Sequence, residues 1–192
     1  MWNLNSVPYS HVIIKDFLPA DKLDSIIQIG QNKKLEPSKI GVSHGQSIEL
    51  PDIRTSYNAW ISVDKENEWL FRHITDAVNE VNKNYFNFNL NYFEDLQFTS
   101  YSEKTQGRYG WHADVYGLSS NMRKLSFVLM LSDPADYTGG ELRISMGENH
   151  ETVINQRGTA IFFPSYCIHE VTPVLTGTRL TLVTWIRGSK FI

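Results

Sequence analysis

The second half of the sequence is a succession of short segments rich in Val, Ile, Phe, Thr and Tyr, separated by Gly, Pro, Asn and Asp. The first set of residues favours β-strands, and the second favours turns. Strands that follow one another without a helix between them predict a β-sandwich or a β-barrel. The predicted strands are residues 96–100, 124–132, 141–145, 159–163, 169–174 and 179–187.

The first half of the sequence predicts one short strand and two helices. We expect the strand at residues 11–14, and apolar residues recur at helical spacing after Phe17 and again over residues 65–82. We expect the first helix to end at Gly30, and Asp64 to cap the start of the second. Helices followed by an all-β half predict an α+β fold in which the helices support one sheet.

Length and composition fit one folded unit. The chain has 192 residues, 41% of them hydrophobic, which is enough for one well-filled core. We therefore expect a single domain over residues 1–192, with helical support over about 15–85 and a β-rich part over about 90–190. The polar segments 31–51 and 116–123 are rich in Ser, Gly and Asn, and we expect both to be mobile loops.

Charge and cysteine content argue against several classes of protein. The formal net charge is -3, and no run of Lys or Arg indicates a nucleic-acid-binding surface, so a nucleic-acid partner is not expected. The single cysteine, Cys167, cannot form an intramolecular disulfide and is compatible with a reducing compartment. Residues 1–10 do not resemble a secretory signal, and no stretch approaches about 18 consecutive apolar residues. We expect a soluble, intracellular (cytoplasmic) protein without a membrane partner.

Two histidines and an aspartate are candidates for a metal site. His112 and Asp114 are two residues apart, so in an extended segment both project to the same side. His169 lies in an apolar β-like segment and is the best candidate for a third ligand. Two histidines and one carboxylate on one face suit Fe(II) and leave positions open for substrate and oxygen. The alternative is that His-x-Asp occurs by chance and that His169 is a hydrogen-bonded core residue.

An arginine that follows His169 supports the metal hypothesis. Arg179 lies just past the turn signal Leu175-Thr-Gly-Thr, where we expect a hairpin that brings the two strands side by side. Its apolar sequence neighbours indicate a buried position. An arginine inside a β pocket needs a planar anion, and a carboxylate can accept two hydrogen bonds from it. The alternative is a surface arginine on a terminal strand.

The order of these residues is similar to that of a known family. His112-x-Asp114, then His169 and then Arg179, resemble the motifs of the 2-oxoglutarate/Fe(II) oxygenases of the prolyl 4-hydroxylase type, and the resemblance runs from about residue 11 to residue 187. Its further segments are Asp52-Ile-Arg-Thr-Ser-Tyr-Asn-Ala-Trp-Ile61, Gln97-Phe-Thr-Ser-Tyr101, Tyr109-Gly-Trp, Leu125-Ser-Phe-Val-Leu-Met-Leu, Gly139-Gly-Glu-Leu142, Gly158-Thr-Ala-Ile-Phe-Phe-Pro and Gly177-Thr-Arg-Leu-Thr-Leu-Val-Thr-Trp185.

The resemblance implies a double-stranded β-helix, or jelly-roll, with supporting N-terminal helices. It implies that the two histidines and the aspartate named above bind Fe(II) and form the catalytic centre. It also implies that Arg179 binds the distal carboxylate of the cosubstrate 2-oxoglutarate, that Tyr101 hydrogen-bonds this molecule, and that Trp185 packs beside it. O2 is then the second cosubstrate, and ascorbate is a further expected cofactor.

The sequence departs from the family pattern near Arg179. Some relatives have a tyrosine on the central strand that also contacts the distal carboxylate, but here Met130 occupies that place. Thr181 or Ser126 is an alternative source of the missing hydroxyl. Collagen-type prolyl hydroxylases usually have Lys where Arg179 stands, whereas oxygen-sensing and bacterial relatives have Arg.

Three further residues are expected on the substrate side of the site. These are Tyr109, Arg54 and Trp60, for which the alternatives are a core aromatic, a solvated arginine and a core tryptophan. Cys167 would share the ligand face with His169 if that segment is extended, but packing as a small buried residue is its expected role.

The resemblance implies hydroxylation of a C–H bond, with a peptidyl proline as the expected substrate and with release of succinate and CO2. A peptide or protein would then be the partner. Within the same chemistry, the alternatives are a free amino acid, a small metabolite or an alkylated base. From another class, the alternative is a non-catalytic metal- or ligand-binding jelly-roll, which Arg179 disfavours because a binding module does not need an arginine for an oxoacid.

Overall fold

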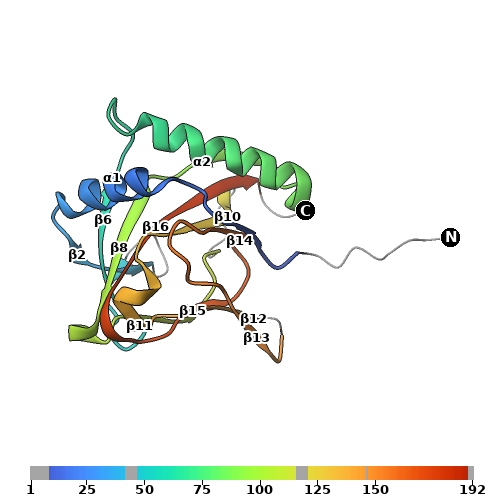
Figure 1. Cartoon of the computed structure of the whole chain (residues 1–192). Helices are drawn as coiled ribbons and strands as arrows, with labels where there is room; N and C mark the ends of the chain where they lie inside the picture. Colours follow the sequence, from blue (N-terminus) through green and yellow to red (C-terminus); the bar gives the residue numbers. More distant parts are fainter. Residues whose placement is uncertain (1–8, 42–46, 116–120, 146, 190–192) are drawn as a thin grey trace.

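Two antiparallel sheets face each other across a shared core, and both helices cover the outer face of the larger sheet (Figure 1). The computed structural model describes residues 9–41, 47–115, 121–145 and 147–189. The helices are α1 (Ala20–Gln31) and α2 (Glu68–Val81), and a π-helical turn, η2 (Asn82–Phe86), continues the second. No helix in these residues is long and apolar enough to cross a membrane.

The larger sheet has nine strands within the described residues. The longest is β16 (Val174–Ser189), which pairs with β10, β8, β7 and β11. The other strands are β1 (Val12–Ile14), β2 (Glu36–Pro37), β6 (Tyr57–Ile61), β7 (Leu90–Phe93), β8 (Leu96–Ser102), β10 (Asn121–Met130), β11 (Tyr137–Gly139) and β14 (Ala160–Pro164).

The smaller sheet lies on the side of the larger sheet that is away from the helices (Figure 1). Its order is β13-β12-β15-β9-β5, and the short strands β3 and β4 pair separately. The bounds are β3 (Ile40–Gly41), β4 (Ser47–Ile48), β5 (Arg54–Thr55), β9 (Arg108–His112), β12 (Leu142–Ser145), β13 (His150–Thr152) and β15 (His169–Val171). Two 3-10 turns, η3 (Glu103–Thr105) and η4 (Pro134–Asp136), complete the elements.

Alternation along the strands gives the larger sheet two different faces. On β8, Leu96 and Phe98 belong to the core beneath the helices. Gln97, Thr99 and Tyr101, which alternate with them, line the space between the two sheets. Strand β8 therefore presents apolar side chains to the helices and mainly polar side chains to the space between the sheets.

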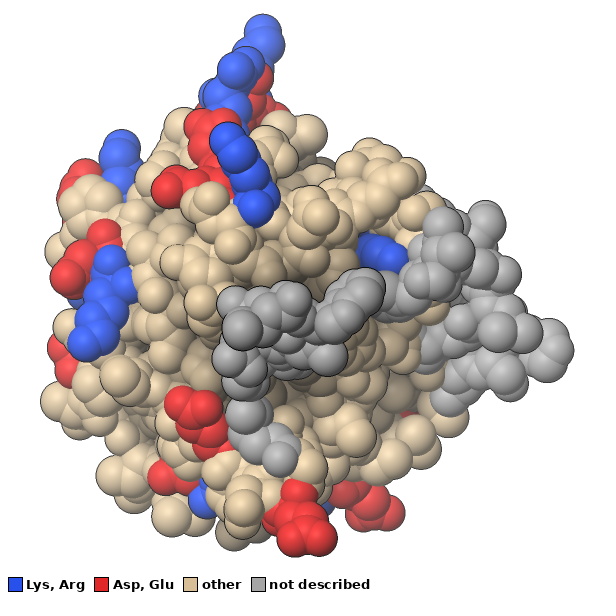
Figure 2. All heavy atoms as spheres, turned by 90° about the vertical axis from the view of Figure 1, so that its right-hand side faces the viewer, with Lys and Arg blue, Asp and Glu red and all other residues tan. Residues whose placement is uncertain are grey.

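The charged side chains on the face seen in Figure 2 are of both signs. Lys and Arg lie beside Asp and Glu there and do not form a block of one sign. Exposed ion pairs also occur within single elements, as between Arg72 and Glu68 on α2 at 2.6 Å. Pairs of this kind contribute little to stability.

The structure corrects both predicted helix boundaries. Helix α1 continues through Gly30 to Gln31, and Gly30 is required for close packing, since a Cβ there would lie 2.3 Å from the Phe98 ring. Helix α2 begins at Glu68, not near residue 65. Asp64 instead closes the preceding turn, where its Oδ1 accepts hydrogen bonds from the backbone N–H groups of Glu66 and Asn67.

The two predicted loops have different outcomes. Segment 31–51 contains the short strands β2, β3 and β4, so the prediction of an unstructured loop is wrong for them. Residues 42–46 of this segment lie outside the described residues. For the segment 116–123, residues 116–120 also lie outside them, and β10 already begins at Asn121.

The predicted hairpin between His169 and Arg179 is wrong. Strand β15, which begins at His169, pairs with β12 and β9, whereas β16 pairs with β10 and β8. The turn signal lies inside β16. Glycine is required at position 177 for two reasons: its φ is 73°, and a Cβ there would lie 2.0 Å from the Asp136 carbonyl oxygen. The histidine and the arginine therefore come from different sheets.

Candidate active site

The three predicted metal ligands lie together in the space between the sheets. His112 ends β9, His169 begins β15, and the two residues face each other in the strand register. Asp114 follows β9 by two residues, and its Oδ1 and Oδ2 lie 3.7 Å from His112 Nε2 and 3.6 Å from His169 Nε2. All three ligand atoms lie within 4.8 Å of one another, and in the described part of the chain no other such group occurs.

Both imidazoles are oriented by backbone carbonyl groups. Nδ1 of His112 lies 2.8 Å from the Gly110 oxygen, and Nδ1 of His169 lies 2.9 Å from the Cys167 oxygen. Because a carbonyl oxygen only accepts, each Nδ1 carries a proton, so Nε2 is the ring atom of each histidine that can bind a metal. Burial, reinforced by the neighbouring His169, lowers the pKa of His112 to about 3, so its ring is neutral at neutral pH.

The aspartate is buried and held by a serine. Asp114 is 7% exposed, and Ser126 Oγ donates to its Oδ2 at 2.7 Å. Burial raises the pKa of Asp114, but His169, His112 and the Ser126 hydroxyl together bring it below its usual value. Two imidazoles and a carboxylate are the donor set that suits Fe(II), so the residues present fit this metal.

At the other end of the same pocket lies Arg179. It is 2% exposed, its Nη2 lies 3.4 Å from Met130 Sδ, and its guanidinium lies 5.3 Å from the centre of the Tyr101 ring. Arg179 Nε has no hydrogen-bond partner among the described residues. A buried donor without a partner is unusual in a folded protein. A ligand carboxylate would supply the missing acceptor, so this end fits 2-oxoglutarate.

The other residues predicted to contact the cosubstrate line this pocket. Tyr101 is opposite Arg179 in the strand register, and Trp185 lies on the same strand as Arg179, with its Nε1 also unpartnered in the described structure. Thr181 lines the pocket as well. Ser126 does not reach Arg179, because it bonds to Asp114 from a position four residues along β10 from Met130, a separation of about 13 Å.

Sequence reasoning missed Tyr137 at the arginine end. Tyr137 begins β11, is 6% exposed, and forms a side-chain hydrogen bond with Arg179. Burial raises the pKa of Tyr137, so the hydroxyl stays protonated. Gly140 lies close by and leaves room for the arginine side chain, because a Cβ at this position would lie 2.9 Å from Arg179 Cδ. No local motif indicated this contact, which depends on β11 pairing with β16.

The predicted substrate-side residues lie at the mouth of the pocket. The Tyr109 ring stacks on His112 with centroids 3.5 Å apart, and the Arg54 guanidinium lies 4.6 Å from the centre of the Tyr109 ring. Arg54 is 8% exposed and donates to Ser56, so it is not a solvated arginine. Trp60 is 47% exposed, so it is not a core tryptophan. All three line a hollow of about 400 Å³ that also reaches His112.

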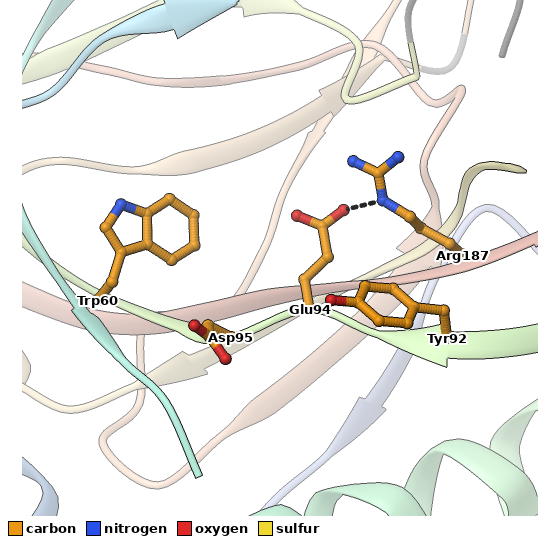
Figure 3. A pocket seen from close by; sticks show the side chains of 5 residues that line it. All are labelled: Trp60, Tyr92, Glu94, Asp95 and Arg187. Atoms are coloured by element: carbon orange, nitrogen blue, oxygen red, sulfur yellow. Dashed lines mark hydrogen bonds and ion pairs between the residues drawn. The ribbon is translucent and has the colours of Figure 1, made fainter.

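Trp60 also borders a second hollow of about 420 Å³ (Figure 3). Glu94 lies between Trp60 and Arg187 in this view and accepts a hydrogen bond from Arg187 Nε at 2.6 Å. Glu94 also accepts two hydrogen bonds from Arg123, whose guanidinium lies 3.6 Å from the centre of the Trp185 ring. No motif in the sequence indicated this cluster, which forms part of one wall of the mouth.

Cys167 does not share the ligand face. It lies in the turn before β15, half-buried, with its Sγ 3.7 Å from the Ser10 carbonyl oxygen. Burial raises the pKa of its thiol to about 11. A protonated thiol that faces the backbone is a packing residue and not a metal ligand.

Comparison with known proteins agrees with this geometry. Residues 96–187 match the family described as the 2OG-Fe(II) oxygenase superfamily. The chain is 39% identical over 89 residues to a PKHD-type hydroxylase of Prochlorococcus marinus, an alignment that covers 46% of this chain and 40% of the relative. The chain thus spans less than half the length of the curated relatives it matches.

Two solved structures are similar over nearly the whole chain. A prolyl-4-hydroxylase of Pseudomonas putida has a TM-score of 0.75 at 22% identity and covers 95% of this chain and 94% of its own. A prolyl hydroxylase of Trichoplax adhaerens, in complex with a peptide fragment of the hypoxia-inducible-factor oxygen degradation domain, has a TM-score of 0.75 at 17% identity. It covers 92% of this chain and 83% of its own. These likenesses confirm the predicted α+β jelly-roll, the fold of prolyl hydroxylases, and over residues 96–187 the chain is similar to the 2OG-Fe(II) oxygenase superfamily.

Proposed function

We propose that this chain is an Fe(II)- and 2-oxoglutarate-dependent dioxygenase that hydroxylates a peptidyl proline and releases succinate and CO2. The observation that carries the proposal is one buried pocket with two complementary ends. His112, Asp114 and His169 form one end, and Arg179 with an unpartnered Nε forms the other. A dicarboxylic acid that bound a metal at one end would reach a guanidinium at the other.

The bound iron supplies the activation of O2, coupled to decarboxylation of 2-oxoglutarate, that protein side chains cannot provide. The chain's own residues bind and orient. The two imidazoles and the carboxylate would hold the metal on one side, which leaves the pocket side open. Arg179 would donate hydrogen bonds to the far carboxylate of the cosubstrate, and Tyr101 and Trp185 would fix its orientation. Val128, Leu142 and Phe163 line the inner pocket and exclude water.

The shape of the mouth supports a polypeptide substrate. The outer hollow of about 400 Å³ opens onto the surface beside the exposed Trp60, so an extended chain could lie across it. Tyr109 and Arg54 form the wall next to the metal ligands, and they would contact the residue to be hydroxylated. The Trichoplax adhaerens prolyl hydroxylase, which has the same fold, is in complex with a peptide fragment, and this supports a polypeptide substrate.

Succinate release and peptide oxidation test this proposal. Metal-free protein would be supplied with Fe(II), 2-oxoglutarate and ascorbate, first alone and then with proline-containing peptides. We expect slow succinate release without peptide, faster release with a true substrate, and a mass gain of one oxygen atom on that peptide. Faster release with a free amino acid or an alkylated base, and with no peptide, would reassign the substrate. No succinate under any condition would favour a non-catalytic binding protein.

A further inference from the structure

A series of buried hydrogen bonds ends on the Asp114 carboxylate. Ser126 Oγ lies 2.7 Å from Asp114 Oδ2 and 2.9 Å from Ser165 Oγ. Both serines are 0% exposed. Because an ionised carboxylate only accepts, the Ser126 hydroxyl donates to Asp114, and the Ser165 hydroxyl donates to Ser126. The direction of both hydrogen bonds is thus set by the aspartate.

Three separate segments of the chain meet at this series. Asp114 follows β9, Ser126 lies on β10 and Ser165 follows β14. Ser165 is fixed by its backbone: its N–H donates to the Lys124 oxygen at 2.9 Å, and its carbonyl oxygen accepts from Asp114 N at 2.9 Å and from Val115 N at 3.0 Å. Ser165 therefore holds the backbone of the aspartate, and Ser126 holds its side chain.

The two carboxylate oxygens of Asp114 are not equivalent. Each oxygen lies near one histidine, Oδ1 at 3.7 Å from His112 Nε2 and Oδ2 at 3.6 Å from His169 Nε2. Only Oδ2 also accepts the Ser126 hydroxyl, whereas Oδ1 has no hydrogen-bond partner in the described part of the chain. A partial turn of the carboxylate would break its hydrogen bond to Ser126, which is 0% exposed and so has no contact with solvent.

We propose that Ser126 is a positioning residue that fixes the Asp114 carboxylate so that it binds the metal through Oδ1 alone. The inference rests on the proposed function, since it assumes a metal at this site. Without the hydroxyl, the carboxylate is free to turn and to offer both oxygens to the metal. A second oxygen on the metal would occupy a position that the cosubstrate or O2 requires. Ser126 would thereby leave a coordination position free on the metal and also raise the affinity of the site for the metal.

Cobalt(II) binding to the metal-free protein tests this without requiring turnover. Titration with Co(II) alone gives a Kd, and its visible absorption reports the number and arrangement of ligands. We expect Ser126→Ala to weaken Co(II) binding about 10- to 100-fold, as removal of a ligand's orienting partner does elsewhere. The absorption spectrum should change as well. Ser126→Thr retains the hydroxyl and should restore both. Ser165→Ala should have a smaller effect, because Ser126 still donates to Asp114.

Ser132 provides the matched control. It is another buried serine, whose Oγ accepts from Leu180 N at 2.7 Å and donates to the Thr178 oxygen at 3.2 Å, on the far side of the larger sheet from the ligands. Ser132→Ala should lower the Tm and leave the Co(II) Kd and spectrum unchanged.

If Ser126→Ala has the wild-type Kd and spectrum, the inference is wrong. Should Ser126→Ala not fold, weak Co(II) binding by Ser126→Thr, which keeps the hydroxyl, would overturn it. If the wild-type protein binds no Co(II), the proposed function fails instead.

Discussion

The two ends of the buried pocket differ in how far the chain satisfies their hydrogen bonds by itself. At the metal end, Gly110, Cys167 and Ser126 each supply a hydrogen bond to one of the three ligand side chains. At the arginine end, the partners of the Arg179 guanidinium are a thioether sulfur, a tyrosine hydroxyl and a ring face, and Nε is unpartnered in the described structure.

This difference indicates how each end is prepared for its ligand. Orienting hydrogen bonds leave the three ligand side chains with little freedom, so a metal meets a site that is already arranged. The arginine end has an unpartnered donor in the described structure, and in the proposed function the distal carboxylate of 2-oxoglutarate would accept from it. The cost of leaving a buried donor unpaired is recovered when the carboxylate binds.

Removal of one metal ligand should have the largest effect. His169→Ala leaves two ligands, and we expect metal affinity to fall by more than about 100-fold, the upper end of what loss of an orienting partner alone produces. Succinate release should then be undetectable. The control is His73→Ala, which removes an exposed histidine of helix α2 whose Nε2 lies 3.0 Å from the Phe17 oxygen. Normal turnover by His169→Ala would remove this residue from the metal site.

Replacement of the metal tests whether turnover depends on iron at the metal end of the pocket. Several divalent ions bind such ligands more tightly than Fe(II), so zinc, cobalt or nickel are expected in the purified protein. Those forms should release no succinate, and removal of the metal followed by Fe(II) should restore turnover. Turnover that is equal with zinc and iron would contradict the redox chemistry proposed here.

Loss of Arg179 should affect the cosubstrate and spare the metal. Truncation of one partner of a buried charged pair typically costs about 2–5 kcal/mol, so Arg179→Ala should raise the KM for 2-oxoglutarate by at least about 30-fold. The Co(II) Kd should stay unchanged, and Arg179→Lys should be partly tolerated. Arg143→Ala, which removes a half-buried arginine paired with Glu141, is the control. A change of less than about twofold in Arg179→Ala would mean that another residue binds the distal carboxylate.

Loss of Trp60, at the mouth of the pocket, should affect the binding of a peptide substrate. An exposed tryptophan at the centre of a binding surface is often worth more than about 1 kcal/mol, so Trp60→Ala should raise the KM for a peptide substrate by about fivefold or more. Slow succinate release without peptide should not change. Trp69→Ala on helix α2 serves as the control; Lys22 Nζ lies 5.0 Å from the centre of the Trp69 ring. Equal losses in coupled and uncoupled turnover would indicate a folding defect and not a substrate contact.

The parts of the fold that the sequence predicted are those that depend on local alternation. The six predicted strands of the second half are all present, although β15 ends at Val171 and β16 begins at Val174. Alternation also predicted that His112 and Asp114 share one side, and the apolar neighbours of Arg179 predicted its burial. In each case a residue's environment follows from the residues next to it in the chain.

The parts that were missed depend on which strand pairs with which. The hairpin prediction assumed that neighbouring strands pair, but a jelly-roll sends consecutive strands to opposite sheets. For the same reason, no motif indicated that Ser165 would meet Asp114 or that Glu94 would meet Arg123. The very short strands β2 to β5 have too few residues for a period to be seen.

The substitution Tyr137→Phe should have the smallest effect, and that effect should be confined to the arginine end of the pocket. Its hydroxyl hydrogen-bonds to Arg179 beside the place where Met130 offers only sulfur. Tyr137→Phe keeps the ring and removes this one bond, which is worth about 1 kcal/mol, so the KM for 2-oxoglutarate should rise about fivefold. The effect should vanish in an Arg179→Ala background, because the tyrosine acts through the arginine. Tyr85→Phe, an exposed tyrosine that packs against Tyr9, is the control. If Tyr137→Phe raises the KM equally with and without Arg179, the tyrosine contacts the cosubstrate directly, and the arginine end holds two independent donors.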